Sequence, residues 1–98
     1  MTAKKQKLKT YKWDPAEHLK TGKDVIAYLD AALEDGDPAI VAEVLGDIAR
    51  SKGMAAIAKK TGLGRESLYK ALSVKGNPRL GTLLKVVNAL GLKLRLAA

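Results

Sequence analysis

Residues 53–72 read GMAAIAKKTGLGRESLYKAL and predict two short helices joined by a tight turn. Apolar side chains fall at the first, fourth, tenth and fifteenth places counted from the first methionine of the stretch, and these are Met54, Ile57, Leu63 and Leu68. Two helices that cross steeply need a small side chain where their backbones approach, which Ala58 supplies. The bend needs a residue that tolerates positive φ, which Gly62 supplies. The segment is therefore predicted to be a helix-turn-helix.

The second predicted helix leaves a set of hydrogen-bonding side chains outside the core, namely Arg65, Glu66, Ser67, Tyr69 and Lys70. Such groups suit the base edges and phosphates of a major groove, so this face predicts binding to duplex DNA. Arg65 can present its guanidinium to guanine, while Glu66 can accept from cytosine or orient Arg65. Tyr69 can reach a thymine methyl group or a phosphate. A merely solvated surface would explain the lysines, but not the gathering of arginine, glutamate and tyrosine on one face.

Charge divides the chain into three zones. Residues 1–12 carry five lysines and no acid, residues 13–51 carry three basic and nine acidic residues, and residues 52–98 carry ten basic residues and one acid. A basic half that holds the helix-turn-helix is typical of polyanion binding, and its phosphate attraction would come from Lys59, Lys60, Lys70, Lys75 and Arg79. The acidic zone is a poor surface for DNA and indicates a second partner, unless its charges only solvate the helices.

Composition argues against several classes of function. The 98 residues include no cysteine and one histidine, so we expect no disulfide framework, no zinc finger, no metal site and no cofactor. The basic half has no glycine-rich phosphate loop and no carboxylate cluster, which argues against an enzyme. RNA-binding proteins often stack bases on exposed aromatic side chains, and this chain has only four aromatic residues, so DNA is favoured over RNA as the ligand. No apolar run is long enough for a membrane span or a signal peptide, and we expect a cytoplasmic protein.

The chain is predicted to form one domain, residues 13–98, after a flexible basic tail at residues 1–12. Residues 13–20 predict a short helix, because Asp14 and Pro15 supply a cap and a first-turn proline. Trp13 just before it could pack on the core or on a partner. Two acidic helices complete residues 13–51. The first is predicted to begin with a capping box between Thr21 and Asp24 and to end at Gly36, and the second starts at Asp37. Within the second of these helices, Gly46 can allow close packing.

The C-terminal third predicts a loop, a closing helix and an alternating end. A glycine and an Asn-Pro step mark a turn at residues 76–78. The closing helix, residues 79–91, would point inward the side chains of Leu80, Leu83, Leu84, Val87 and Leu90, and end at Gly91. Residues 92–96 read LKLRL and alternate as a half-buried strand does. Such a strand could pair with its own copy in a dimer, or the leucines could instead tuck onto the core.

Two resemblances to known families follow from these motifs. Residues 56–92, with their Asn-Pro loop and leucine-rich closing helix, resemble the helix-turn-helix of the Cro/C1-type repressor superfamily. Nearly everything after the basic tail resembles the probable addiction module antidote protein family, which is HigA-like. The segments that carry this likeness are WDP at 13–15, DVIAYL at 24–29, GDP at 36–38, LGDIAR at 45–50, GM at 53–54, RESLYKAL at 65–72 and GNP at 76–78.

The resemblance implies an all-α, five-helix repressor-like fold that binds an operator as a homodimer. It also implies an antitoxin that represses its own promoter and neutralises a small basic toxin similar to RelE or HigB. The family's recognition positions fall on Arg65, Glu66, Ser67, Tyr69 and Lys70, and its phosphate-binding loop falls on Asn77 and Arg79. This chain departs from such repressors at Gly64, which offers only a backbone N–H, and at Ala55 and Ala56, which replace a common glutamine.

A toxin that binds RNA is usually basic, so the acidic helices are its candidate surface, and the residues concerned are Asp30, Glu34, Asp35, Glu43 and Asp47. Two alternatives remain open on sequence grounds. One is a phage-type transcriptional regulator without a toxin partner, and the other, less favoured, is an RNA-binding module.

Overall fold

The computed structural model describes residues 21–97, which form five helices and no strand. The helices are α3 (Gly22–Asp35), α4 (Pro38–Lys52), α5 (Met54–Thr61), α6 (Arg65–Ala71) and α7 (Leu80–Ala89). The all-α prediction is therefore confirmed. The predicted tail at residues 1–12, the helix at residues 13–20 and the packing of Trp13 lie outside the described residues. No helix in the described part is long and apolar enough to cross a membrane.

Side-chain caps start the two N-terminal helices as the sequence predicted. The Asp24 N–H donates to Thr21 Oγ1 and the Thr21 N–H donates to Asp24 Oδ2, both at 3.1 Å, which closes a capping box at α3. Asp37 Oδ1 accepts from the Ala39 N–H at 3.0 Å, and Pro38 occupies the first turn of α4. Between the two helices, Gly36 takes a left-handed conformation that reverses the chain.

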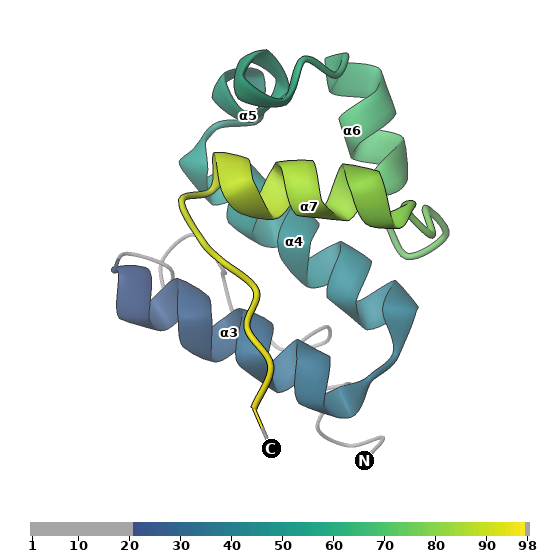
Figure 1. The fold of residues 1–98 in the computed structure, drawn as a ribbon. Coiled ribbons are helices and arrows are strands. Elements are labelled where there is room, and N and C mark those ends of the chain that lie inside the picture. The colour runs from purple at the N-terminus through teal and green to yellow at the C-terminus, as the bar shows by residue number, and fades with distance from the viewer. Residues whose placement is uncertain (1–20, 98) are drawn as a thin grey trace, which may run out of the picture.

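The chain from α5 to α6 forms the predicted helix-turn-helix-like pair at one end of the molecule (Figure 1). Gly62 ends α5 with a φ of 75°, and its N–H donates to the Ala58 carbonyl at 2.9 Å. Residues with a β-carbon are strained at this φ, which is why glycine suits the bend. Leu68 is fully buried and Leu63 packs against the core, so both anchor the second helix as expected.

The core gathers around α4, which packs against α3, α5 and α7. The largest fully buried side chains come from four of the five helices and the residue after α6, and they are Leu45, Ile48, Leu68, Leu72, Val25 and Val86. Gly46 lies where α4 passes the end of α6, and a β-carbon there would collide with the carbonyl oxygen of Leu72. The close approach that the glycine suggested is therefore present, and it lets α4 support α6 directly.

The closing helix differs from the prediction in which leucines it buries. Leu80 and Leu84 were expected to point inward, but they are 69% and 46% exposed. The buried stripe is instead Val86, Val87 and Leu90, with Leu83 partly buried, because α5 and α4 meet only that side of α7. The helix is also slightly shorter than residues 79–91: Arg79 is its N-cap, Leu90 its C-cap, and Gly91 follows with a φ of 78°.

The predicted strand at residues 92–96 is not present in the described chain. The Leu92 N–H donates to the Val87 carbonyl at 3.1 Å, so the residues after α7 first fold back over the helix end. Only Leu92 packs on the core, while Leu94 and Leu96 are exposed. An alternating sequence needs a neighbouring strand for its backbone hydrogen bonds, and residues 21–97 provide none. The segment crosses the molecule toward α3 as an extended end (Figure 1).

Candidate nucleic-acid interface

Helix α6 buries a single side chain and turns the rest outward. Leu68 is fully buried, whereas the surrounding candidates are all exposed, namely Arg65, Glu66, Ser67, Tyr69 and Lys70. Leu68 and Leu72 fix the helix against the core and so set the direction of the other side chains. Gly64 precedes the helix in an extended conformation and is exposed, with no side-chain cap. The structure therefore brings six of the nine predicted DNA-binding residues onto one exposed element.

The outward face of α6 is shallowly hollowed. The residues that line the hollow are Glu66, Ser67, Tyr69, Lys70 and Ser73. At its end, the Ser73 hydroxyl donates to the Lys70 carbonyl at 2.8 Å, which satisfies one of the last acceptors of the helix. Hydroxyl, carboxylate and ammonium groups thus share one concave surface, which can offer both donors and acceptors to a ligand.

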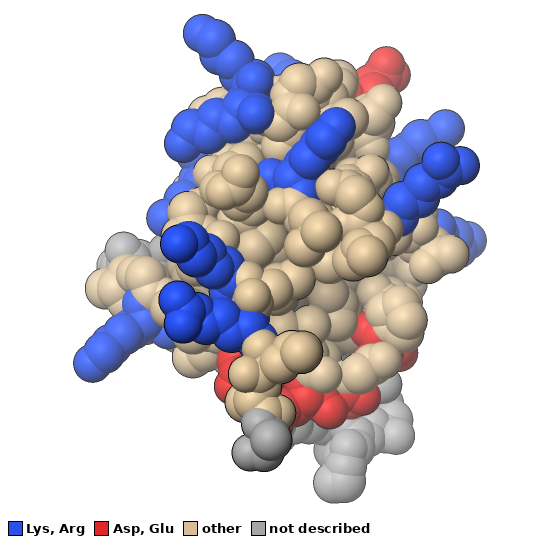
Figure 2. Space-filling view, in the orientation of Figure 1, with Lys and Arg blue, Asp and Glu red and all other residues tan. Residues whose placement is uncertain are grey.

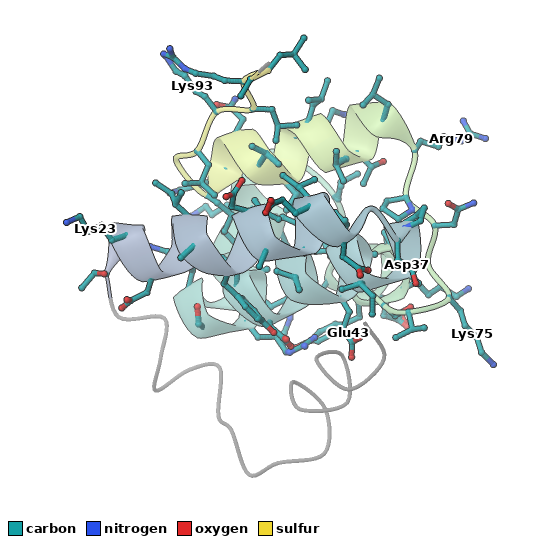
Figure 3. All side chains as sticks on the ribbon, turned by 90° about the horizontal axis from the view of Figure 1, so that it is seen from below. Lys23, Asp37, Glu43, Lys75, Arg79 and Lys93 are labelled. Atoms are coloured by element: carbon teal, nitrogen blue, oxygen red, sulfur yellow. The ribbon has the colours of Figure 1, made fainter. Side chains whose placement is uncertain are left out.

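The loop after α6 holds the other three candidates, Lys75, Asn77 and Arg79, and all three are exposed. A β-carbon at Gly76 would collide with the carbonyl oxygens of Lys70 and Ala71, so this glycine packs the loop against the end of α6. Lys75 and Arg79 extend from the same side of the molecule (Figure 3). The loop therefore places two cations close to the end of α6.

A further basic position was missed by the sequence reasoning. Lys85 on α7 lies with Lys60, Thr61 and Asn88 around a small hollow between α5 and α7. Lys60 was predicted to attract phosphates. Lys85 is 25 positions further along the chain, and no local sequence pattern links it to Lys60. Only the packing of α7 on α5 brings the two lysines together.

The five acidic candidates do not form one patch. Asp30, Glu34 and Asp35 are exposed on α3, whereas Glu43 and Asp47 on α4 are partly buried. Asp30 lines a groove with the C-terminal segment, while Glu43 lies on the side of the molecule opposite that segment (Figure 3). In Figure 2, acidic side chains gather in the lower part and appear again at the upper right, and basic ones lie along the upper part and the sides.

Asp47 has an intramolecular role that the sequence did not suggest. Tyr28 on α3 donates its hydroxyl to Asp47 Oδ2 at 2.7 Å, and Arg50 pairs with Asp47 Oδ1. Burial and then the hydrogen bond to the carboxylate raise the pKa of the Tyr28 phenol above its ordinary value. This carboxylate therefore joins α3 to α4, and its contact with a toxin stays a prediction.

Within residues 21–97, no group of three or more histidine, cysteine, aspartate or glutamate side chains is placed to hold a metal ion.

These features define an all-α domain with a helix-turn-helix-like pair and an exposed polar face on α6 at one end. The chain matches the family described as "Probable addiction module antidote protein" over residues 9–98, and it belongs to that family, as its motifs predicted. A relative from Haemophilus influenzae, described as an uncharacterized protein, is 43% identical over 81 residues, covering 83% of this chain and 84% of the relative. No solved structure matches the chain. The narrower likenesses to HigA and to Cro/C1 repressors stay predictions.

Proposed function

We propose that this protein is the antitoxin of a type II toxin–antitoxin module and that it represses its own promoter by binding duplex DNA through α6. The observation that supports DNA binding is that α6 buries one leucine and exposes five polar side chains. A helix anchored in this way can enter a major groove, which is about 12 Å wide, while the core holds it from behind.

The exposed groups divide into two roles. Arg65 at the start of α6 reads a guanine through its two-pronged guanidinium, and Glu66 accepts from cytosine or orients that guanidinium. Lys75, Asn77 and Arg79 in the following loop bind phosphates and set the register on the duplex. Lys60 and Lys85 add attraction for the backbone from the α5–α7 side.

The toxin arm rests on family membership and on charge. An antidote needs a protein partner, and a toxin that acts on RNA carries a basic surface. The exposed carboxylates of Glu34 and Asp35 on α3 are suited to such a partner and lie on a different helix from the DNA-binding groups. One chain can then hold DNA and toxin at separate surfaces.

The DNA arm is tested by fluorescence anisotropy of the full-length protein with a labelled duplex from the region upstream of its own gene. A scrambled duplex and an RNA of the same sequence serve as competitors. We expect the upstream duplex to bind at least about 10³-fold more tightly than the scrambled one, with affinity that falls steeply as salt rises. Equal competition by the scrambled duplex or by the RNA would overturn operator recognition.

Toxin neutralisation is tested by co-expression with the product of the reading frame adjacent to its gene, which we expect to be small and basic. We expect the two chains to co-purify, and we expect this protein to relieve growth arrest caused by its neighbour. If the neighbour neither binds nor arrests growth while operator binding persists, the protein is a regulator without a toxin.

A further inference from the structure

The chain turns sharply directly after α6. The Gly76 N–H donates to the Ser73 carbonyl at 2.9 Å, so residues 73–76 form a four-residue turn. Val74 and Lys75 are its two central residues, and both are exposed. Lys75 extends away from the molecule in Figure 3, and the loop projects beside the lower end of α6 in Figure 1. The tip of this turn is therefore open to a ligand.

Three contacts hold the turn against the end of α6. The Ser73 hydroxyl donates to the Lys70 carbonyl at 2.8 Å. A β-carbon at Gly76 would collide with the carbonyl oxygens of Lys70 and Ala71, so backbone packs against backbone here. The third contact is the hydrogen bond between Ser73 and Gly76 within the turn. The position of Val74 relative to α6 is therefore set by the backbone around it and not by burial of its own side chain.

The side chain of Val74 contributes little to the fold. It is 46% exposed, and it does not belong to the core cluster. Turns favour glycine, proline, asparagine, aspartate and serine, which tolerate the turn conformation or hydrogen-bond to the backbone, and a valine side chain offers no such hydrogen bond. The methyl groups of Val74 are thus presented to the outside by a turn that does not need them.

The outward face of α6 leads to this turn. The residues that line its hollow are Glu66, Ser67, Tyr69, Lys70 and Ser73. Since Ser73 lies three positions after Lys70, it continues the same face beyond the end of the helix, and Val74 follows it. Between residues 65 and 79, the exposed large apolar side chains are those of Tyr69 and Val74. A polar face that is suited to DNA bases therefore ends in an apolar side chain.

We propose that Val74 reads a thymine of the operator by packing its methyl groups against the 5-methyl group of that base. Thymine is the one DNA base with a methyl group in the major groove, and apolar side chains contact it there. The inference rests on the proposed function, because it requires α6 to lie in the major groove. It adds a base-reading residue to a turn in which the neighbouring Lys75 contacts phosphate.

The place of this thymine in the operator follows from the length of α6. The seven residues of the helix rise by about 10 Å. That rise corresponds to roughly three base pairs at 3.4 Å each. Arg65 lies at the start of α6 and Val74 lies beyond its end. The thymine should therefore lie about three or more base pairs from the guanine that Arg65 reads.

The experiment replaces each thymine of the operator in turn by deoxyuridine, which lacks only the methyl group, and measures binding of the full-length protein by fluorescence anisotropy. At one position the replacement should weaken wild-type binding about fourfold, which is the effect of one buried methyl group. Val74→Ala should weaken binding to the unmodified operator by a similar factor and should not respond to deoxyuridine at that position. Val74→Ile, which keeps the methyl groups, should respond as wild type does. This non-additivity is the signature of a direct contact.

Two further variants serve as controls. Leu84→Ala is matched to Val74→Ala, because Leu84 is also 46% exposed but lies on α7. It should respond to deoxyuridine as wild type does at every position. Lys75→Ala should weaken thymine and uracil duplexes by the same factor, because it removes a contact to phosphate. The midpoint of urea unfolding should stay near the wild-type value in both alanine variants of exposed apolar residues, which shows that the fold is intact.

The possible failures of this inference differ from those of the proposed function. The inference alone is overturned when the operator is recognised but no thymine shows a methyl dependence that Val74→Ala removes. It is also overturned when Tyr69→Ala removes that dependence and Val74→Ala does not. A coupled thymine directly beside the guanine read by Arg65 would overturn the predicted register. A protein that binds a scrambled duplex as tightly as the operator overturns the proposed function and this inference together.

Discussion

The hydroxyl of Tyr28 on α3 donates a 2.7 Å hydrogen bond to Asp47 Oδ2 on α4, 19 positions away in the chain. Arg50, one turn further along α4, pairs with the other oxygen of the same carboxylate. The Asp47 carboxylate is partly buried and so loses hydrogen bonds to water. The hydrogen bond from the Tyr28 phenol replaces one of them. This pair ties the acidic helix α3 to the central helix that supports α6.

Tyr28→Phe is expected to lower the free energy of unfolding by about 1–3 kcal/mol, because it removes the hydrogen bond and leaves part of the carboxylate unsatisfied. Urea unfolding followed by circular dichroism measures the change. Tyr69→Phe, at an exposed tyrosine on α6, is the control and should change stability by less than about 0.5 kcal/mol. Equal effects of the two substitutions would contradict the role assigned to the pair.

The pH dependence of stability should also reveal Tyr28. Its pKa in the folded state is raised above the unfolded value, which is near 10, so the folded state binds this proton more tightly. The resulting stabilisation is complete below about pH 10 and is lost as the pH rises above it. The difference in unfolding free energy between wild type and Tyr28→Phe should therefore become smaller as the pH rises from about 9 to about 11. A constant difference would mean that the phenol does not carry the effect.

Gly46→Ala tests the close approach of α4 to the end of α6. Alanine should gain up to about 1 kcal/mol in helix propensity, but its β-carbon would collide with the backbone of Leu72. We expect a net loss of about 1–3 kcal/mol, measured by urea unfolding. Gly81→Ala in α7 is the matched control, since nothing lies within 4 Å of the added carbon. If both variants were equally stable, the packing at Gly46 would not be tight.

Two substitutions distinguish reading of bases from attraction to phosphates. Arg65→Ala should cost about 1–3 kcal/mol of specific binding and relax the preference at one base pair. Lys75→Ala should weaken all duplexes alike and lower the salt dependence by about one unit of slope. Anisotropy titrations with operator and single-base variants measure both effects. Unchanged operator affinity in both variants would mean that α6 and its loop are not the DNA face.

Charge reversal on α3 tests the acidic surface. Glu34→Lys with Asp35→Lys should slow association with the toxin, most strongly at low salt, because long-range attraction steers the encounter. Surface plasmon resonance at several salt concentrations gives the association rate. The charge-conserving pair Glu34→Asp with Asp35→Glu is the control. Full neutralisation by the reversed variant would place the toxin contact elsewhere.

Interactions between residues close in the chain could be predicted well. The Thr21–Asp24 capping box, the Asp37 cap and the Gly62 turn depend on partners two to four positions away, and the structure contains all three. The exposed candidates on α6 were also predicted correctly as outward-facing, because burial of Leu68 determines where its helical neighbours point. Whether they bind DNA stays a prediction.

Leucine placement shows where sequence reasoning was insufficient. Leu80 and Leu84 fit an apolar helical stripe as well as Leu83, Val87 and Leu90 do. Periodicity shows that α7 has an apolar side, but its leucines cover too wide an arc to reveal which part meets the core. The predicted strand at residues 92–96 was wrong for a similar reason: alternation describes a strand only when a partner strand is present.

The amino-acid sequence by itself determined the helices, their caps, the turn between α5 and α6 and the polar face of α6, because each depends on contacts within about one helical turn. Tertiary structure alone decided that Asp47 pairs with Tyr28, that Lys85 lies beside Lys60, and that the outer leucines of α7 stay exposed. These relationships join residues far apart in the chain. Their distances are set by how α3, α4, α5 and α7 pack, which no local pattern specifies.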